Sequence, residues 1–149
     1  MRVNRIIAVF LLARSLFATA SVGAEPLEKL IARADAAGDE KALLYAKVAQ
    51  REVEVADEHF TSGDIKQAYA AVQAIVDYSD KSLAAAKQHH KKLKETEIAL
   101  RLTSRHLQDV EHTLALEDRP LVKTAVDHIE DIRGQLLQIM FAPPAPPKR

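Results

Sequence analysis

Residues 64–116 decide the fold, and they read DIKQAYAAVQAIVDYSDKSLAAAKQHHKKLKETEIALRLTSRHLQDVEHTLAL. The stretch contains neither glycine nor proline, and most of its residues are the strong helix formers Ala, Leu, Lys, Glu, Gln and Arg. No part of the chain shows the period-2 alternation of β-branched and aromatic residues that indicates a strand. The chain is therefore predicted to be all-α.

A seven-residue register runs through this stretch and predicts one long helix over about 64–116. The row is mostly apolar and consists of Ile65, Val72, Ser79, Ala86, Leu93, Leu100, Leu107 and Leu114. At 1.5 Å per residue such a helix spans about 80 Å. The alternative is a break near 77–80, because the sequence Asp-Tyr-Ser-Asp favours turns and caps.

Glycine and proline punctuate the rest of the chain into three shorter helices. The Gly-Asp pairs at 38–39 and 63–64 each combine a helix stop with a helix N-cap. Asp118 is expected to cap the last helix, and Pro120 is tolerated in the first turn of that helix. Together with the long helix, the predicted segments are about 26–37, 39–61, 64–116 and 119–140.

Short turns on both sides of the long helix predict helical hairpins. The last helix should fold back antiparallel on the second half of the long helix, so that Leu107 meets Ile129 and Leu100 meets Leu136. The helix over 39–61 should pair with the first half in the same way. The expected shape is an elongated pair of hairpins that share one helix. Neither hairpin forms a compact core alone, so we expect a homo-oligomer or a standing protein partner.

The N-terminal segment 1–24 has the pattern of an export signal. A basic start precedes the apolar run Ile6–Ala13, and small residues then lead to Ala24. Arg14 interrupts the run, which argues more strongly against a membrane-spanning anchor than against a cleaved signal. We expect cleavage after Ala24 and a periplasmic or secreted protein, with an uncleaved anchor as the alternative.

The mature chain is expected to form one helical domain over 25–141, followed by a Pro-rich flexible tail over 142–149. The whole sequence carries 21 basic and 21 acidic side chains. Three of the arginines lie before residue 25, so the mature part has 18 basic side chains, 21 acidic ones and a net charge of −3. This balance argues against binding nucleic acid through bulk charge.

The side chains exclude several kinds of chemistry. Without cysteine there are no disulfides, thiolate metal sites, covalently attached haem or cysteine nucleophiles. No Gly-x-Ser-x-Gly, P-loop or dinucleotide fingerprint is present. The basic cluster at 87–94 contains no aromatic residue that could stack on a base. We therefore predict a protein that is not an enzyme, holds no cofactor and binds no nucleic acid.

Six histidines raise the question of a metal site, but their spacing does not favour one. No two lie three or four positions apart on one helix, and the Glu-x-x-His element of di-iron bundles is absent. Asp109 and His112 form a single weak match. The hairpin should bring His106 near His128, a pair without a carboxylate in register. We predict no metal, and a metal-binding bundle is kept as the last alternative.

Part of the chain resembles a known helix-pair family. Over about 45–78, the pattern Val55-Ala56, Phe60, Gly63-Asp64, Ala68, Val72 and Ile75 is similar to one tetratricopeptide repeat. Small residues stand where the paired helices approach, and a Gly-Asp turn divides them. The resemblance implies a helix-pair scaffold that binds other proteins. The later stretch, 92–120, also resembles small exported bacterial helical proteins, a resemblance that implies no activity.

The far side of the long helix carries the candidate binding surface. If Leu93, Leu100 and Leu107 face the last helix, then Ile98 and Leu102 point nearly the opposite way. This pair needs a cover, either a second subunit, a partner helix or another segment of this chain. Four basic residues are expected on the same side. The candidate partner-binding set is Lys87, Lys91, Lys94, Ile98, Leu102 and Arg105.

Three functional hypotheses follow. The leading one is an exported, non-enzymatic helical scaffold or adaptor that acts through protein–protein contacts. The first alternative is an envelope-surface binder or periplasmic chaperone, because an apolar helix face rimmed by lysines suits an anionic surface. The second alternative is the metal-binding bundle. Against an interface at Ile98 and Leu102, two exposed aliphatic side chains are ordinary on a soluble protein.

Overall fold

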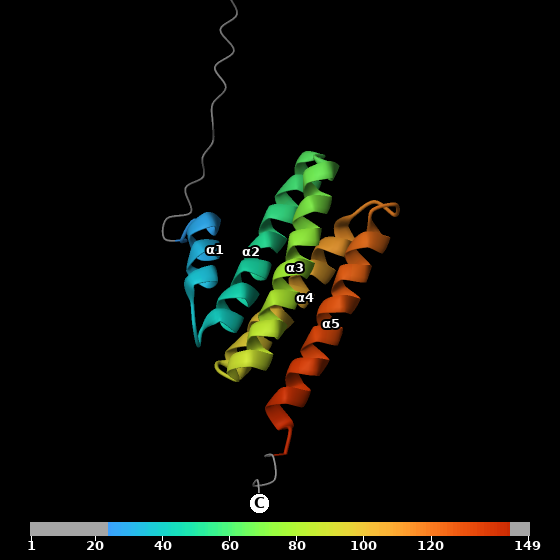
Figure 1. Cartoon of the computed structure of the whole chain (residues 1–149). Coiled ribbons are helices and arrows are strands. Elements are labelled where there is room, and N and C mark those ends of the chain that lie inside the picture. The colour runs from blue at the N-terminus through green and yellow to red at the C-terminus, as the bar shows by residue number, and fades with distance from the viewer. Residues whose placement is uncertain (1–23, 144–149) are drawn as a thin grey trace, which may run out of the picture.

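The computed structural model describes residues 24–143, which form five α-helices and no strand (Figure 1). The helices are α1 (Leu27–Ala36), α2 (Lys41–Ser62), α3 (Ile65–His89), α4 (Leu93–Thr113) and α5 (Arg119–Phe141). The prediction of an all-α protein is confirmed. The predicted export signal, apart from its last residue, and all but the first two residues of the predicted tail lie outside the described residues.

The turn between α2 and α3 forms as the Gly-Asp pair predicts. Gly63 adopts a left-handed backbone with φ of 78°, where a side chain would be strained. The Asp64 carboxylate then accepts a hydrogen bond from the Gln67 backbone N–H at 3.4 Å and caps α3. Asp39 does not have this role, because Glu40 is the residue that precedes α2. Asp118 makes no side-chain cap on α5 either.

The prediction of one continuous helix over 64–116 is wrong, because the chain breaks at residues 90–92 between α3 and α4. His90 and Lys92 both adopt left-handed backbones, with φ of 51° and 54°. The Lys92 carbonyl accepts the first backbone bond of α4 and a second bond from the Thr96 hydroxyl, at 2.9 and 2.7 Å. Neither left-handed residue is glycine, so the sequence carries no ordinary stop signal here.

The alternative break near 77–80 is also wrong, because these residues lie inside α3. Ser79 is fully buried, and its hydroxyl donates to the Ile75 carbonyl one turn earlier at 2.7 Å. A serine that bonds back to its own helix in this way satisfies its polar group without a turn.

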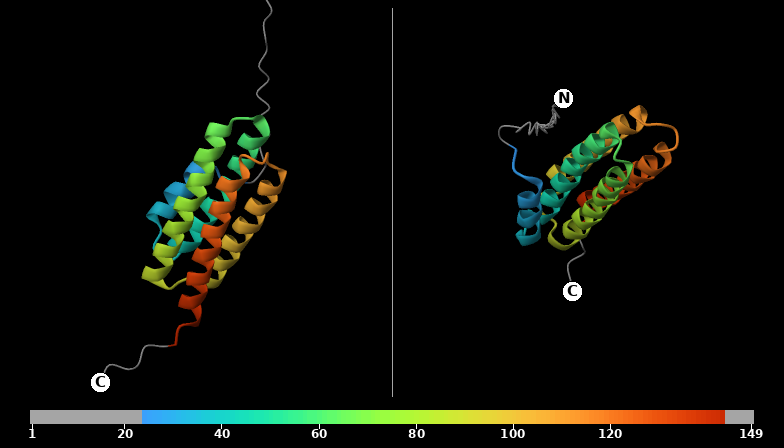
Figure 2. Two further views of the ribbon diagram at one scale, coloured as in Figure 1. Left: turned by 90° about the vertical axis from the view of Figure 1, so that its right-hand side faces the viewer. Right: turned by 90° about the horizontal axis from the view of Figure 1, so that it is seen from above.

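The helices form two hairpins, α2–α3 and α4–α5, that lie side by side in one bundle. Figure 2 shows two layers, with α2 beside α4 in one and α3 beside α5 in the other. Helices α3 and α4 are connected across the bundle and approach each other little, while α1 packs on the outside of α2. The hairpins therefore complete each other's core within one chain, and the argument for self-association from an incomplete core no longer holds.

The core lies between the two layers and is aliphatic. Its largest fully buried side chains include Ile75, Leu100, Leu107, Ile129 and Leu136. Helix α2 contacts α1, α3 and α4, so its buried residues are spread over most of its circumference. A hydrogen bond of 2.7 Å from the Ser82 hydroxyl to the Ala42 carbonyl ties α3 to α2.

Candidate functional site

The candidate surface is a groove between α2 and α4, hereafter the α2/α4 groove. Leu43, Ile98, Ala99 and Leu102 form its apolar lining, and Lys47, Gln50 and Glu95 complete its walls. Its volume is about 290 Å³. Ile98 is half-buried, whereas Leu102 remains 45% exposed, the largest exposed fraction for a leucine in the middle of any described helix. The two residues predicted to need a cover thus lie beside α2, another segment of this chain, which covers them only in part.

Only apolar packing joins the two helices that form this groove. Among the described residues, no side-chain hydrogen bond or ion pair links α2 to α4. The other layer differs, since Asp80 of α3 lies 2.8 Å from His128 of α5 and Lys87 of α3 donates to Gln135 of α5 at 3.0 Å. Apolar contacts are not directional, so an apolar side chain from another molecule can pack between α2 and α4 without breaking a polar bond.

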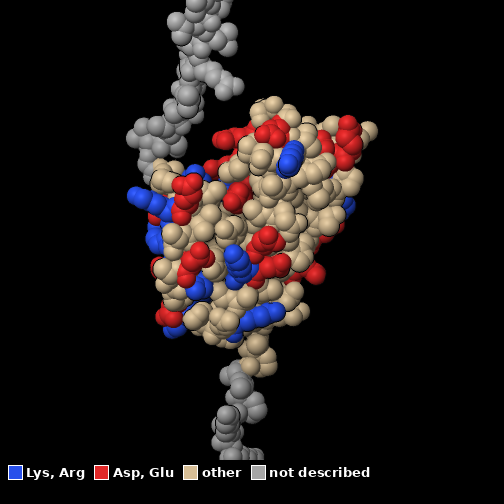
Figure 3. Space-filling view, turned by 45° about the horizontal axis from the view of Figure 1, so that its top comes forward, with Lys and Arg blue, Asp and Glu red and all other residues tan. Residues whose placement is uncertain are grey.

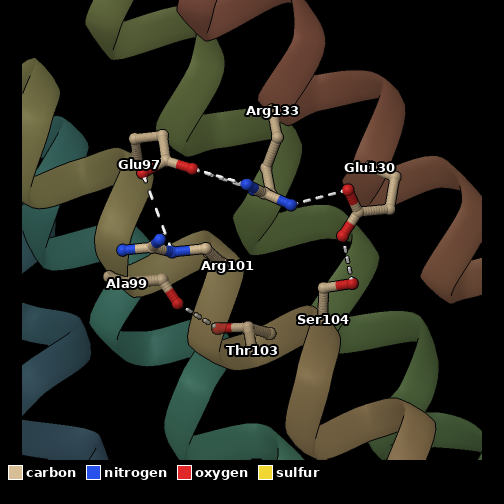
Figure 4. A network of polar contacts seen from close by, with 7 residues as sticks. All are labelled: Glu97, Ala99, Arg101, Thr103, Ser104, Glu130 and Arg133. Atoms are coloured by element: carbon tan, nitrogen blue, oxygen red, sulfur yellow. Dashed lines mark hydrogen bonds and ion pairs between the residues drawn. The ribbon is translucent and has the colours of Figure 1, made fainter.

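A second face of α4 is held in place by a polar network with α5 (Figure 4). Arg133 donates to Glu97 of α4 and to Glu130 of its own helix, each at 2.6 Å. The Ser104 hydroxyl of α4 donates to Glu130 at 2.5 Å. These bonds fix the rotation of α4 about its axis, and that rotation turns Ile98 towards α2.

The electrostatics of this network are those of a stabilising ion pair. Partial burial raises the pKa of Glu130, but hydrogen bonds from Ser104 and Arg133 outweigh it and hold that pKa below its ordinary value. Burial lowers the pKa of Arg133, and its two carboxylate partners outweigh this and raise it. Both groups therefore remain charged at neutral pH, and neither is poised for proton transfer.

The six predicted partner-binding residues do not all share one face. Lys87 lies on α3, and its bond to Gln135 places it on the side where α3 meets α5. Its expected position beside Ile98 is wrong, because the break at 90–92 turns the chain between them. Lys91, in the connection, is exposed, as are Lys94 and Arg105 on α4. By helical register Lys94 and Arg105 stay on the stripe of Ile98 and Leu102.

Sequence reasoning missed the α2 side of the groove. Leu43, Lys47 and Gln50 lie on successive turns of one stripe of α2, and none was expected near α4. A signal for this contact was present, because α2 carries apolar residues all round rather than on one stripe. Leu43 and Leu44 are adjacent and point to different neighbours. A helix that is apolar all round is surrounded by other elements.

A second cluster of polar groups lies where α1 packs on α2, and it includes residues of α3 that contact Tyr45. The Tyr45 hydroxyl donates to Asp35 at 2.8 Å, and its ring centre lies 6.1 Å from that of Tyr78. Lys81 stands over the Tyr78 ring at 4.7 Å, a cation–π contact. Burial, followed by the hydrogen bond to Asp35, raises the pKa of Tyr45 to about 12. The phenol therefore stays protonated and serves to attach α1, not to act as a base.

Glu52 is the most deeply buried ionisable residue described. It is 8% exposed, makes no described hydrogen bond or ion pair, and burial raises the pKa of its carboxyl. A carboxyl with a raised pKa is a general-acid candidate, but such a group needs a concave site beside it. Glu52 lines none of the described grooves. Its effect is therefore on stability.

A smaller apolar groove of about 210 Å³ lies on the opposite layer, between α3 and α5. Val72, Val76 and Leu121 line it, and its upper edge is closed by Tyr69, whose hydroxyl donates to Asp118 at 2.6 Å. Polar bonds thus span this groove, whereas none spans the α2/α4 groove. The α2/α4 groove is the better candidate for a binding site.

The histidines do not come together as expected. His128 bonds to Asp80 on the α3 side of the bundle, whereas His106 lies beside Asp57 and Asp109 where α4 meets α2. The predicted approach of His106 and His128 is wrong. In the range 24–143, no group of three or more His, Asp or Glu side chains is arranged to hold a metal ion.

None of the five described helices combines the length and the apolar character that crossing a membrane requires. No family model matches the chain, and neither a curated protein nor a solved structure shows significant similarity to it.

Proposed function

We propose that the protein is an exported, non-enzymatic helical scaffold or adaptor that binds a partner protein through the α2/α4 groove. The main support for this proposal is the solvent exposure of Leu102. It stays 45% exposed in the middle of a well-packed helix, directly beside an apolar groove. An apolar groove with an exposed leucine at its edge is the pattern of a surface that a partner completes.

The dimensions of the groove indicate what it would bind. Its walls run from Leu43 to Gln50 on α2 and from Glu95 to Leu102 on α4. Each wall covers two helical turns, or about 10 Å. This length fits an amphipathic partner helix that inserts two or three apolar side chains one turn apart. Lys47 and Glu95 carry opposite charges at the rim, so the partner helix should carry polar flanks of mixed sign.

Two further features support the proposal. The first is the pattern of residues 1–24, which favours export. The second is the resemblance of about 45–78 to a tetratricopeptide helix pair, which falls on α2 and the first half of α3. The wall that α2 contributes to the groove begins just before this segment and runs into it.

The test is a pair of matched substitutions. Leu102→Glu places a charge in the α2/α4 groove, and Leu121→Glu places the same charge in the α3/α5 groove, at a residue that is 39% exposed. Both sites are exposed enough that folding stability should change by about 0.5 kcal/mol or less. Partner yield is then measured by affinity purification of each tagged variant from its own cells.

We expect Leu102→Glu to reduce the yield of a specific partner by at least about tenfold, because the new charge cannot be desolvated in an apolar contact. Leu121→Glu should leave that yield unchanged. Equal yields from Leu102→Glu and the unsubstituted protein would overturn the proposal. Recovery of no chain but this one would also overturn it and would make the groove a dimer contact.

A further inference from the structure

One end of the bundle is basic. Between residues 87 and 94 the chain carries four lysines and two histidines and no acid. These residues form the last turn of α3, the connection at 90–92 and the first turn of α4, so they gather at one end, hereafter the basic end. With Glu95 included and both histidines neutral, the net charge of this segment is +3.

The charges of the basic end are mostly free. Lys92 lies 3.7 Å from Glu95, and Lys87 is bonded to the neutral amide of Gln135. Lys91 and Lys94 are exposed and have no described ion pair. The left-handed backbones on both sides of Lys91 turn the chain sharply, so that Lys91 and Lys92 lie at the corner between α3 and α4.

The C-terminal turns of α5 add apolar side chains to the same end. Figures 1 and 2 show α5 ending near the connection between α3 and α4. The bond from Lys87 to Gln135 fixes this neighbourhood. Phe141 follows Gln135 by six residues, about 9 Å farther along the helix axis, and is 77% exposed. Leu137 is 36% exposed. Phe141 thus lies at the same end of the bundle as these lysines, farther along the axis of α5.

The two ends of the bundle differ in charge. The connections at the other end lie at 63–64 and 114–118 and carry Asp64, Glu117 and Asp118. Figure 3, in which that end comes forward, shows acidic side chains there and others spread over the rest of this face. At the basic end itself, the connection between α1 and α2 carries Asp39 and Glu40, on the side away from α5 (Figure 1). The basic surface is therefore confined to the α3, α4 and α5 side of the end.

We propose that the basic end is a peripheral binding surface for an anionic lipid bilayer. Lysines suit the headgroup layer, and an exposed phenylalanine beyond them suits the boundary with the acyl chains. Only Glu95 of this segment lines any described groove, so a flat partner fits this end better than a peptide or a small ligand. The net charge of −3 on the mature part disfavours nucleic acid.

This proposal is independent of partner binding in the α2/α4 groove, because the groove lies along the side of the bundle. A protein bound by its basic end keeps Leu102 accessible. Both contacts can therefore form together, and the bilayer would hold the adaptor at the membrane surface.

The test uses the protein as its cells process it, with its N-terminus established by mass spectrometry. Binding is measured by co-sedimentation with vesicles of phosphatidylcholine alone or with roughly 30% phosphatidylglycerol, an anionic lipid. Lys91→Glu/Lys94→Glu reverses two charges at the basic end, and the matched control Lys29→Glu/Lys66→Glu reverses two exposed lysines elsewhere. Phe141→Ser is matched by Leu116→Ser, because both residues are 77% exposed and Leu116 lies at the other end.

We expect binding to the anionic vesicles only. Each lysine near an anionic surface contributes about fivefold to partitioning, so Lys91→Glu/Lys94→Glu should weaken it by at least about 30-fold. Phe141→Ser should weaken it by about tenfold. The two controls and Leu102→Glu should bind as the unsubstituted protein does. Raising the salt concentration from about 0.1 M to about 0.5 M should also weaken binding.

Three results would overturn the proposal. The first is equal binding by the basic-end variant and its control. The second is equal binding to vesicles with and without phosphatidylglycerol. The third is competition by soluble polyphosphate together with no effect of Phe141→Ser, which would make the basic end a site for free phosphate polymers.

Discussion

Glycine at positions 90 and 92 should stabilise the protein, because both residues adopt a backbone that favours glycine. His90 has φ of 51° and Lys92 has φ of 54°. A left-handed conformation costs a residue with a side chain about 1–2 kcal/mol. Glycine avoids this cost but loses about 0.5–1 kcal/mol more backbone entropy on folding. The expected net gain is about 0.5–1 kcal/mol for each substitution and about 1–2 kcal/mol for His90→Gly/Lys92→Gly.

The same double substitution has the opposite effect if α3 and α4 form one helix. Glycine in a helix interior costs about 1 kcal/mol relative to alanine, and His and Lys themselves cost up to about 0.7 kcal/mol, so the two substitutions would destabilise a continuous helix by about 1 kcal/mol. The two arrangements thus differ by about 2–3 kcal/mol, with opposite signs. Ala84→Gly is the control, since residue 84 is exposed inside α3 and should lose about 1 kcal/mol in either case.

The assay is urea unfolding followed by circular dichroism, with the free energy of unfolding extrapolated to water. The break at 90–92 predicts a higher midpoint for His90→Gly/Lys92→Gly and a lower one for Ala84→Gly. A lower midpoint for both variants would refute the break and with it the packing of α2 against α4.

Three further predictions concern the stability of the bundle. Glu52→Gln should stabilise the protein at neutral pH, because burial raises the pKa of Glu52 above 4.5 and folding stability falls as pH rises through that raised pKa. The gain over the unsubstituted protein should vanish below about pH 4.5. A gain that does not depend on pH would contradict a burial effect on this carboxyl. Arg133→Met should destabilise the protein more at high pH than at low pH. The pKa of Glu130 is lowered in the folded protein, so its ion pair stabilises the fold above about pH 4.5 and this stabilisation is lost as pH falls. Urea unfolding should show a larger loss of unfolding free energy at about pH 7 than at about pH 3. Leu136→Ala should lower the free energy of unfolding by about 2–5 kcal/mol, because Leu136 is only 1% exposed. The control Leu137→Ala, at an exposed neighbour, should lower it by about 0.5 kcal/mol or less. Equal losses would mean that α5 is rotated about its axis.

Local chemistry made most of the helix boundaries predictable. Gly63 and Asp64 combine the left-handed stop with the side-chain cap, so the turn between α2 and α3 could be placed to within one or two residues. The break at 90–92 could not be found in this way. The left-handed conformations of His90 and Lys92 are imposed by packing, because they let α4 leave α3 and join α2.

The register itself concealed the break. Ala86 and Leu93 stand seven residues apart on opposite sides of it, and the heptad spacing continues although the helix does not. Both residues face the core from different helices, Ala86 fully buried and Leu93 in part. A sequence pattern reports which residues are buried, but not whether they belong to one helix or two.

The candidate site was predictable on one side only. Helical phase identified Ile98 and Leu102 as pointing away from the last helix, and the structure places both in one groove. The opposite wall depends on which helices become neighbours, which is a tertiary contact between α2 and α4 that no local signal fixes. The apolar residues spread round α2, with Leu43 next to Leu44, were the one indication of it.

Photo-crosslinking in living cells shows whether the α2/α4 groove binds a partner protein. A photoreactive amino acid replaces Leu102, and a second protein with the same amino acid at position 121 serves as the control. Partner binding in this groove predicts a discrete heavier product from position 102 that contains another protein and is absent from position 121. No product from position 102, or one of twice the mass that contains only this chain, would contradict it.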